Sequence, residues 1–71
     1  MKDDIFILIG NNIKKFREEK GYTLNDISIS TNLDINFLEN IEKNGVDGNI
    51  TFDVLIKISS VLDINITDLF R

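Results

Sequence analysis

The chain has 71 residues, enough for one small domain that buries only about 60% of its unfolded surface. Its composition, 42% hydrophobic and 28% charged, is typical of a globular domain rather than of a disordered tail. Because the sequence contains no cysteine and no histidine, it excludes a disulfide scaffold, thiol catalysis and a structural zinc site, and it favours a reducing cytoplasm. The net charge of −4 argues against nonspecific affinity for nucleic acid, although the cations can still cluster on one face.

The longest apolar run, IFILI at residues 5–9, is too short to span a bilayer and lacks the features of a signal peptide. We therefore expect no membrane association. Residues 1–8 are predicted to form an apolar N-terminal extension of the first helix. Farther along this helix, apolar side chains recur at helical spacing and are expected to face the core: Ile9, Ile13 and Phe16.

The second helix has clear start signals. Gly21 is the expected stop of the first helix, and Thr23 follows closely as the N-cap of the second. Thr23 and Asp26 have the spacing of a capping box, with Asp in place of the usual Glu. Ile27 and Thr31 are expected on the inward face of this helix.

A tight turn separates the second helix from the third. Asn32 suits this turn because asparagine tolerates a positive φ, and Leu33 is expected to plug the turn from beneath. Asp34 is the expected N-cap of the third helix, whose Leu38 and Ile41 face the core. This spacing is typical of a helix-turn-helix, although an ordinary corner between two packed helices needs similar packing.

The rest of the chain predicts two more helices. Thr51 is the expected N-cap of a fourth helix, and a short fifth helix is expected from about Thr67. Strict alternation never persists long enough to predict a strand. The sequence thus predicts an all-α fold of five short helices in one domain, residues 1–71, with the helix-turn-helix at about 23–43. The expected inward positions of the fourth helix are Phe52, Leu55, Ile58 and Leu62.

Three stretches carry a family resemblance: EEKGYTL at 18–24, FLENIEKN at 37–44 and ISSVLDINI at 58–66. Over about residues 9–70 the chain resembles the XRE/Cro-type helix-turn-helix family, to which the lambda-type phage repressors belong. It is especially similar to the DNA-binding domain of SinR-type repressors. The resemblance implies a compact, five-helix, lambda-repressor-like DNA-binding domain whose second and third helices form the helix-turn-helix.

The resemblance also implies a structural ion pair. Arg17, near the end of the first helix, and Glu42, near the end of the third, match a pair that ties these helices together. A planar guanidinium meets a carboxylate in a bidentate fork, for which arginine is better suited than lysine. We therefore expect Arg17→Ala to destabilise the fold by leaving Glu42 partly buried and unpaired.

One arc of the third helix lies opposite Leu38 and Ile41 if successive residues turn by about 100°. The resemblance implies that this arc reads base edges, where asparagine pairs with adenine and isoleucine packs against a thymine methyl. Glu39 can accept from cytosine or be neutralised by Lys43 four residues on. The expected base-reading residues are Ile35, Asn36, Glu39 and Asn40. The expected contacts with the DNA backbone are Thr23, Lys43, Asn44, Gly45, Thr51 and Phe52.

These features predict a sequence-specific DNA-binding transcriptional regulator of the repressor type, which binds a palindromic double-stranded operator as a homodimer. A protein antagonist is a further candidate partner. No cofactor, metal or catalytic residue is expected, because no nucleophile–base or metal-binding constellation is present in the sequence. The expected dimer surface, for which a hydrophobic staple is an equal alternative, consists of Phe6, Ile7, Ile64, Ile66 and Phe70.

A second interpretation follows from the acidic and apolar character of the motif. Asp34 stands where the family often has a serine or threonine cap, and a carboxylate near a phosphate costs about 1 kcal/mol or more. The alternative is a protein-binding helix-turn-helix module, such as an antirepressor or a partner-regulating protein, with weak or no DNA affinity. The apolar residues at outward or marginal positions of the motif are Leu24, Ile29, Ile35 and Phe37.

Overall fold

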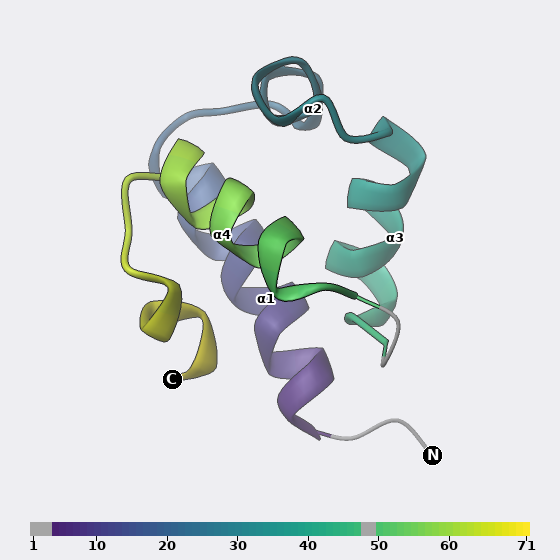
Figure 1. Cartoon of the computed structure of the whole chain (residues 1–71), viewed down its shortest axis with the longest axis vertical. Helices are drawn as coiled ribbons and strands as arrows, with labels where there is room; N and C mark the ends of the chain where they lie inside the picture. Colours follow the sequence, from purple (N-terminus) through teal and green to yellow (C-terminus); the bar gives the residue numbers. More distant parts are fainter. Residues whose placement is uncertain (1–3, 48–49) are drawn as a thin grey trace.

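A computed structural model of the chain describes residues 4–47 and 50–71. In this part of the chain the backbone forms four α-helices and one 3-10 helix, and no strand. The prediction of an all-α fold is therefore confirmed. The elements are α1 (Asp4–Glu19), α2 (Leu24–Thr31), α3 (Ile35–Asn44), α4 (Phe52–Val61) and the 3-10 helix η1 (Ile66–Phe70) (Figure 1).

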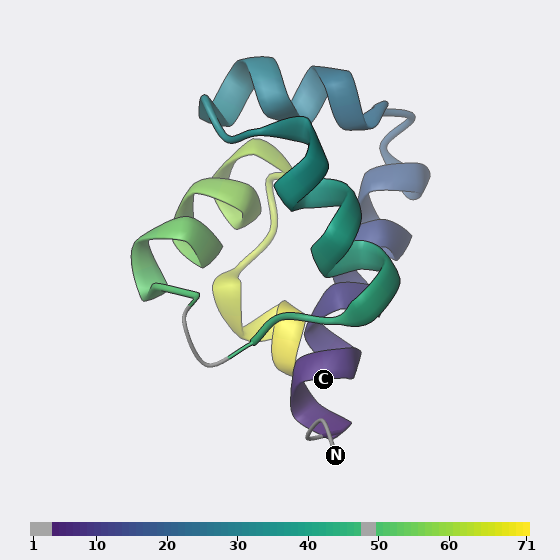
Figure 2. The same cartoon turned by 90° about the vertical axis from the view of Figure 1, so that its right-hand side faces the viewer.

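Helix α2 lies across one end of the domain, and η1 and the start of α1 lie at the opposite end (Figure 1, Figure 2). Helix α1 contacts α3 and η1, α2 contacts α3 and α4, and α4 contacts η1. These contacts enclose one hydrophobic core, to which every helix contributes. Its fully buried side chains include Ile13 of α1, Ile27 of α2, Leu38 of α3, Ile58 of α4 and Leu69 of η1.

Three of the helices begin where the sequence predicts a cap. Thr23 Oγ1 accepts from the Asp26 N–H at 3.0 Å and Asp26 Oδ2 accepts from the Thr23 N–H at 2.9 Å, which completes the capping box. The Asp34 carboxylate accepts from the Phe37 N–H, and the Thr51 hydroxyl caps α4 in the same way. Each of these bonds satisfies a backbone amide that the first turn of a helix leaves unpaired. Because both partners lie within three residues of each other, the local sequence is enough to predict where each helix begins.

The short fifth helix that the sequence predicts from about Thr67 is present as a 3-10 helix that begins at Ile66. A segment this short gains little from α-helical hydrogen bonds, and 3-10 turns are common in such pieces. Its end is held by Asn12, a buried residue of α1, whose Nδ2 donates to the Leu69 carbonyl at 2.9 Å and to the Arg71 carbonyl at 3.2 Å.

The inward placement predicted for Phe52 is wrong, because this side chain is 61% exposed. Phe52 is the first residue of α4, and a helical side chain leans over the preceding turn, so here it extends beyond the packed part of the helix. Leu55 and Ile58 are buried as predicted. The connection before α4 also contributes Val46 to the core and Ile50 to its edge, and neither residue belongs to a helical period.

Two glycines allow α1 and α3 to approach each other closely. A Cβ atom on Gly10 would collide with the Ile41 carbonyl oxygen, and one on Gly45 would lie 2.9 Å from the Phe6 carbonyl oxygen. The Val46 N–H donates to the same Phe6 carbonyl at 3.1 Å. This contact fixes how α3 lies on α1, and thereby the direction in which the exposed side of α3 points.

Candidate nucleic-acid interface

Side chains of α2 fix the turn that leads into α3. Asn32 has φ 60°, the left-handed conformation predicted from the sequence. The Ser28 hydroxyl donates to the Leu33 carbonyl at 2.6 Å, and the Leu33 N–H donates to Thr31 Oγ1 at 3.2 Å. With both the turn conformation and its hydrogen bonds set, α3 is held at a defined orientation to α2, as in a helix-turn-helix.

Arg17 and Glu42 form a bidentate ion pair between α1 and α3. Arg17 Nε donates to Glu42 Oε2 at 2.7 Å, and Nη2 donates to Oε1 at 2.9 Å. The two side chains are only 12% and 7% exposed. Arg17 Nη1 also donates to the Tyr22 carbonyl at 2.8 Å, so the guanidinium joins α1, α3 and the segment before α2. The hydrogen bonds to Glu42 raise the pKa of Arg17 above its ordinary value although burial opposes this.

Helix α3 has one buried and one exposed face. Leu38 and Ile41 are 1% and 3% exposed and belong to the core. The opposite face, called the outer face below, is polar apart from one isoleucine that is 39% exposed. The structure thus gathers the predicted base-reading residues and one lysine on a single surface. The outer face consists of Ile35, Asn36, Glu39, Asn40 and Lys43.

One side-chain hydrogen bond lies along the exposed side of α3. Asn44 Nδ2 donates to Asn40 Oδ1 at 2.7 Å, and both residues are exposed. Residues four apart are neighbours on a helix surface, so the spacing of the two asparagines is the sequence signal for this bond. In the described part of the chain no side chain binds the amide of Asn36.

The groups expected to bind DNA phosphates are not equally accessible. Thr23 and Thr51 are exposed N-caps, and the helix N-termini behind them favour an anion. Gly45, in contrast, is buried, and its N–H donates to the Ile41 carbonyl at 2.9 Å. The Gly45 amide is therefore engaged within its own chain, whereas Thr23 and Thr51 are open to a ligand.

Carboxylates outnumber cations when the outer face and the starts of α2, α3 and α4 are taken together. Glu39 lies within the outer face, Asp34 caps α3, and Asp26 and Asp53 lie in the first turns of α2 and α4. Lys43, in the last turn of α3, is the cation of the outer face. Electrostatic attraction to phosphates is therefore weak at this surface.

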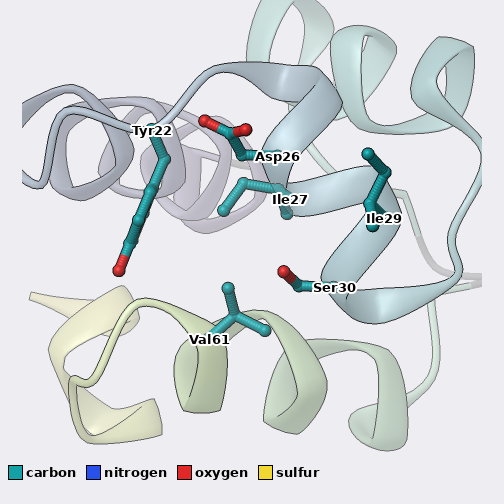
Figure 3. A pocket seen from close by; sticks show the side chains of 6 residues that line it. All are labelled: Tyr22, Asp26, Ile27, Ile29, Ser30 and Val61. Carbon is teal, nitrogen blue, oxygen red and sulfur yellow. The ribbon is translucent and has the colours of Figure 1, made fainter.

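A surface hollow of about 550 Å³ lies between α2 and the end of α4 (Figure 3). Tyr22 stands at one side of the hollow, and Ile29 and Ser30 of α2 stand at the other. Because its lining contains a carboxylate and no cation, the hollow does not extend a phosphate-binding surface. It is lined by Tyr22, Asp26, Ile27, Ile29, Ser30 and Val61.

Residues 10–71 match the family described as helix-turn-helix domain. Since this match covers most of the sequence, the chain belongs to the helix-turn-helix domain family, and it is of the XRE type predicted from the sequence. Within residues 4–47 and 50–71, no helix is long and apolar enough to cross a membrane. The same residues contain no group of three or more carboxylate side chains placed to hold a metal ion.

Two transcriptional regulators are similar in sequence. The HTH-type transcriptional regulator SinR of Bacillus licheniformis is 36% identical over 64 residues, which cover 90% of this chain and 57% of SinR. The HTH-type transcriptional regulator SlrR of Bacillus subtilis (strain 168) is 33% identical over 63 residues, 89% of this chain and 41% of SlrR. The chain therefore spans about half the length of these relatives.

Solved structures show the same fold. SinR, the master regulator for biofilm formation, in complex with DNA superposes with a TM-score of 0.79 and 35% identity over 89% of this chain and 98% of that chain. A complex of SinR with the SinI protein gives a TM-score of 0.78 and 35% identity, over 89% of this chain and 60% of that chain. The restriction-modification controller protein C.Esp1396I gives a TM-score of 0.82 and 30% identity, over 97% and 87% of the two chains.

Proposed function

We propose that this chain is a sequence-specific DNA-binding transcriptional regulator of the repressor type, which occupies promoter DNA by placing α3 in the major groove. The main support for this proposal is the outer face. Its exposed polar side chains lie on the second helix of a helix-turn-helix, opposite the buried Leu38 and Ile41. The complex of SinR with DNA supports it, since a relative with this fold binds DNA.

The side chains of the interface have distinct chemical roles in this proposal. Asn36 donates to adenine N7 and accepts from adenine N6, and Ile35 packs against a thymine methyl. Glu39 accepts from the amino group of cytosine. The N-termini of α2 and α4, behind Thr23 and Thr51, point their amides at phosphates and fix the position of α3 along the duplex.

Selection from random duplex DNA tests the proposal. The wild-type protein enriches one motif, and Asn36→Ala relaxes one position within it at a cost of about 1–3 kcal/mol. Asn11→Ala is the matched control, because it removes the same side chain from an exposed position on α1 and leaves the motif unchanged. The absence of any enriched motif at low salt refutes the proposal.

The acidic surroundings of the outer face give binding a shallow salt dependence. Each phosphate that a cation neutralises contributes a slope of about −0.9 to the logarithm of affinity against the logarithm of salt concentration. Lys43→Gln therefore reduces this slope by about one unit and weakens all sequences alike. Lys57→Gln, an exposed lysine on α4, is the control. An unchanged slope in Lys43→Gln shows that Lys43 contacts no phosphate.

We further propose that the protein acts as a homodimer, because two copies can occupy half-sites about one helical turn apart. The surface expected from the sequence is only partly available. Phe6, Ile64 and Ile66 are half-buried against the core, whereas Ile7 and Phe70 are 42% and 38% exposed. The proposed contact between protomers is therefore centred on Ile7 and Phe70.

The molecular mass in solution tests the dimer. Ile7→Ser and Phe70→Ser are expected to shift the mass toward that of a monomer at concentrations where the wild type is dimeric. Ile56→Ser is the matched control, because Ile56 is 41% exposed but lies on α4. Equal masses for the wild type and all three variants contradict the proposed surface.

A second candidate function is protein binding, which an exposed isoleucine of α2 favours. Ile29 is 72% exposed and lies beside the hollow between α2 and α4. The complex of SinR with SinI is a relative bound to another protein, so a protein antagonist fits either function. No enrichment of DNA, together with capture of a protein partner that Ile29→Ser abolishes, favours this second function.

A further inference from the structure

We propose that Asn44 determines which base Asn40 reads, by fixing the orientation of the Asn40 side-chain amide. This inference rests on the proposed function, because it concerns how α3 reads a base pair. Its basis is the hydrogen bond from Asn44 Nδ2 to Asn40 Oδ1 at 2.7 Å, between two exposed side chains one helical turn apart.

The hydrogen bond decides which group Asn40 presents to a ligand. An asparagine amide carries one acceptor oxygen and one donor nitrogen on opposite sides of a planar group. Because Oδ1 of Asn40 faces Asn44 at the end of α3, Nδ2 faces away from Asn44. Asn40 therefore presents a pair of N–H donors, and its carbonyl oxygen is turned toward the chain's own helix.

This orientation conflicts with the contact that asparagine usually makes with adenine. That contact needs both groups of the amide, since Oδ1 accepts from adenine N6 and Nδ2 donates to adenine N7. Guanine instead presents two acceptors, N7 and O6, on the same edge, and these match the two hydrogens of Nδ2. Asn40 therefore prefers guanine. Asn36, whose amide is held by no side chain that the structure describes, keeps the adenine contact.

Asn44 acts on the base through Asn40 and is a positioning residue. It is the last residue of α3, whereas a recognition helix contacts base edges mainly with its N-terminal residues. Two asparagines of one helix thus have opposite preferences, although their side chains are identical. The difference arises from the residue one helical turn farther along α3. Asn40 accepts a hydrogen bond from Asn44, whereas no side-chain hydrogen bond joins Asn36 to Asn40 in the described part of the chain.

The inference is tested by measuring affinities for two duplexes that differ at one base pair. This pair is the position of the selected motif that Asn40→Ala relaxes. The wild type binds the guanine duplex about fivefold or more tightly than the adenine duplex, the lower end of the discrimination expected for a good side-chain–base pair. In Asn44→Ala the oxygen of Asn40 is released, and the ratio falls to one or below.

A reversed variant gives a sharper test. Asn44→Asp replaces the donor by an acceptor, so Nδ2 of Asn40 turns toward the new carboxylate and Oδ1 turns outward. The preference then moves to adenine or cytosine, whose amino groups donate in the major groove. Because the readout is a ratio for one protein, a uniform loss of affinity or of stability does not alter it. Lys57→Gln, on the exposed side of α4, is the control and keeps the wild-type ratio.

The outcomes separate this inference from the proposed function. If the enriched motif has adenine at the position that Asn40→Ala relaxes, the inference is wrong and the proposed function stands. The same holds if Asn40→Ala relaxes no position, or if the ratio is equal in the wild type, Asn44→Ala and Asn44→Asp. If no motif is enriched by the wild type, the proposed function itself is wrong.

Discussion

The inner and outer faces of α3 hold their side chains in different ways. On the inner face, Leu38 and Ile41 are buried in the core, and Glu42 accepts two hydrogen bonds from Arg17 of another helix. On the outer face, the hydrogen bond to Asn40 comes from α3 itself. The inner face therefore stabilises the fold, and the outer face leaves its side chains available for a ligand. Substitutions on the two faces should affect different measurements.

The largest effect is expected from Leu38→Ala on the inner face. Removing a fully buried leucine side chain is expected to lower the free energy of unfolding by about 2–5 kcal/mol, because a cavity remains. Chemical denaturation measures this change, and Ile35→Ala on the outer face of the same helix is the matched control. A comparable loss in Ile35→Ala would remove the distinction between the two faces.

Arg17→Ala should have the next largest effect, about 1–3 kcal/mol of unfolding free energy. It removes two hydrogen bonds to Glu42, whose side chain is only 7% exposed in the intact pair, and leaves that carboxylate unpaired. Lys14→Ala, which removes an exposed cation from the same helix, should change stability by less than about 0.5 kcal/mol. If Arg17→Ala is as mild as Lys14→Ala, the ion pair does not stabilise the fold.

Asn36→Ala should separate binding from stability. Affinity for the selected operator is expected to fall by about 1–3 kcal/mol, because one bidentate contact is lost. The free energy of unfolding should stay within about 0.5 kcal/mol, since the side chain is exposed. Titration by fluorescence anisotropy and a denaturation curve on the same sample measure both. A loss of stability equal to the loss of affinity would assign Asn36 to the fold.

The smallest effect is expected from Asp34→Ser, and it has the opposite sign. Serine retains the N-cap of α3, so stability should change by only a few tenths of a kcal/mol. Operator affinity should rise by about 1 kcal/mol at low salt, because a carboxylate near the phosphates is removed. Glu19→Gln is the control, because it removes one negative charge at the C-terminal end of α1. Unchanged affinity in Asp34→Ser would place the phosphates away from this cap.

The sequence predicted most of the fold because the signals involved are local. The caps at Thr23, Asp34 and Thr51 bond to residues within three positions, and the positive φ of Asn32 is a property of asparagine at a tight turn. The periodic apolar residues of α1, α2 and α3 mark the sides that must be buried. The sequence therefore also predicted that the outer face would be polar.

Other features depend on how distant segments meet. The exposure of Phe52 and the hydrogen bond of Asn12 to η1 depend on which helix ends pack against the core. The spacing of apolar residues along the chain does not predict this. The partial burial of Phe6, Ile64 and Ile66 likewise reduced the expected dimer surface to two exposed residues. The burial of Gly45, whose amide ends α3, depends in the same way on the contact of α3 with α1.

Local sequence signals were thus enough to predict where the helices begin, which of their sides are apolar and which residues form the turn. Each of these depends on bonds or burial within one or two helical turns. The close approach of α1 and α3 at Gly10, which sets how the outer face is displayed, became apparent only in the folded chain. That contact joins backbone atoms of residues far apart in the chain, and no local pattern fixes their distance.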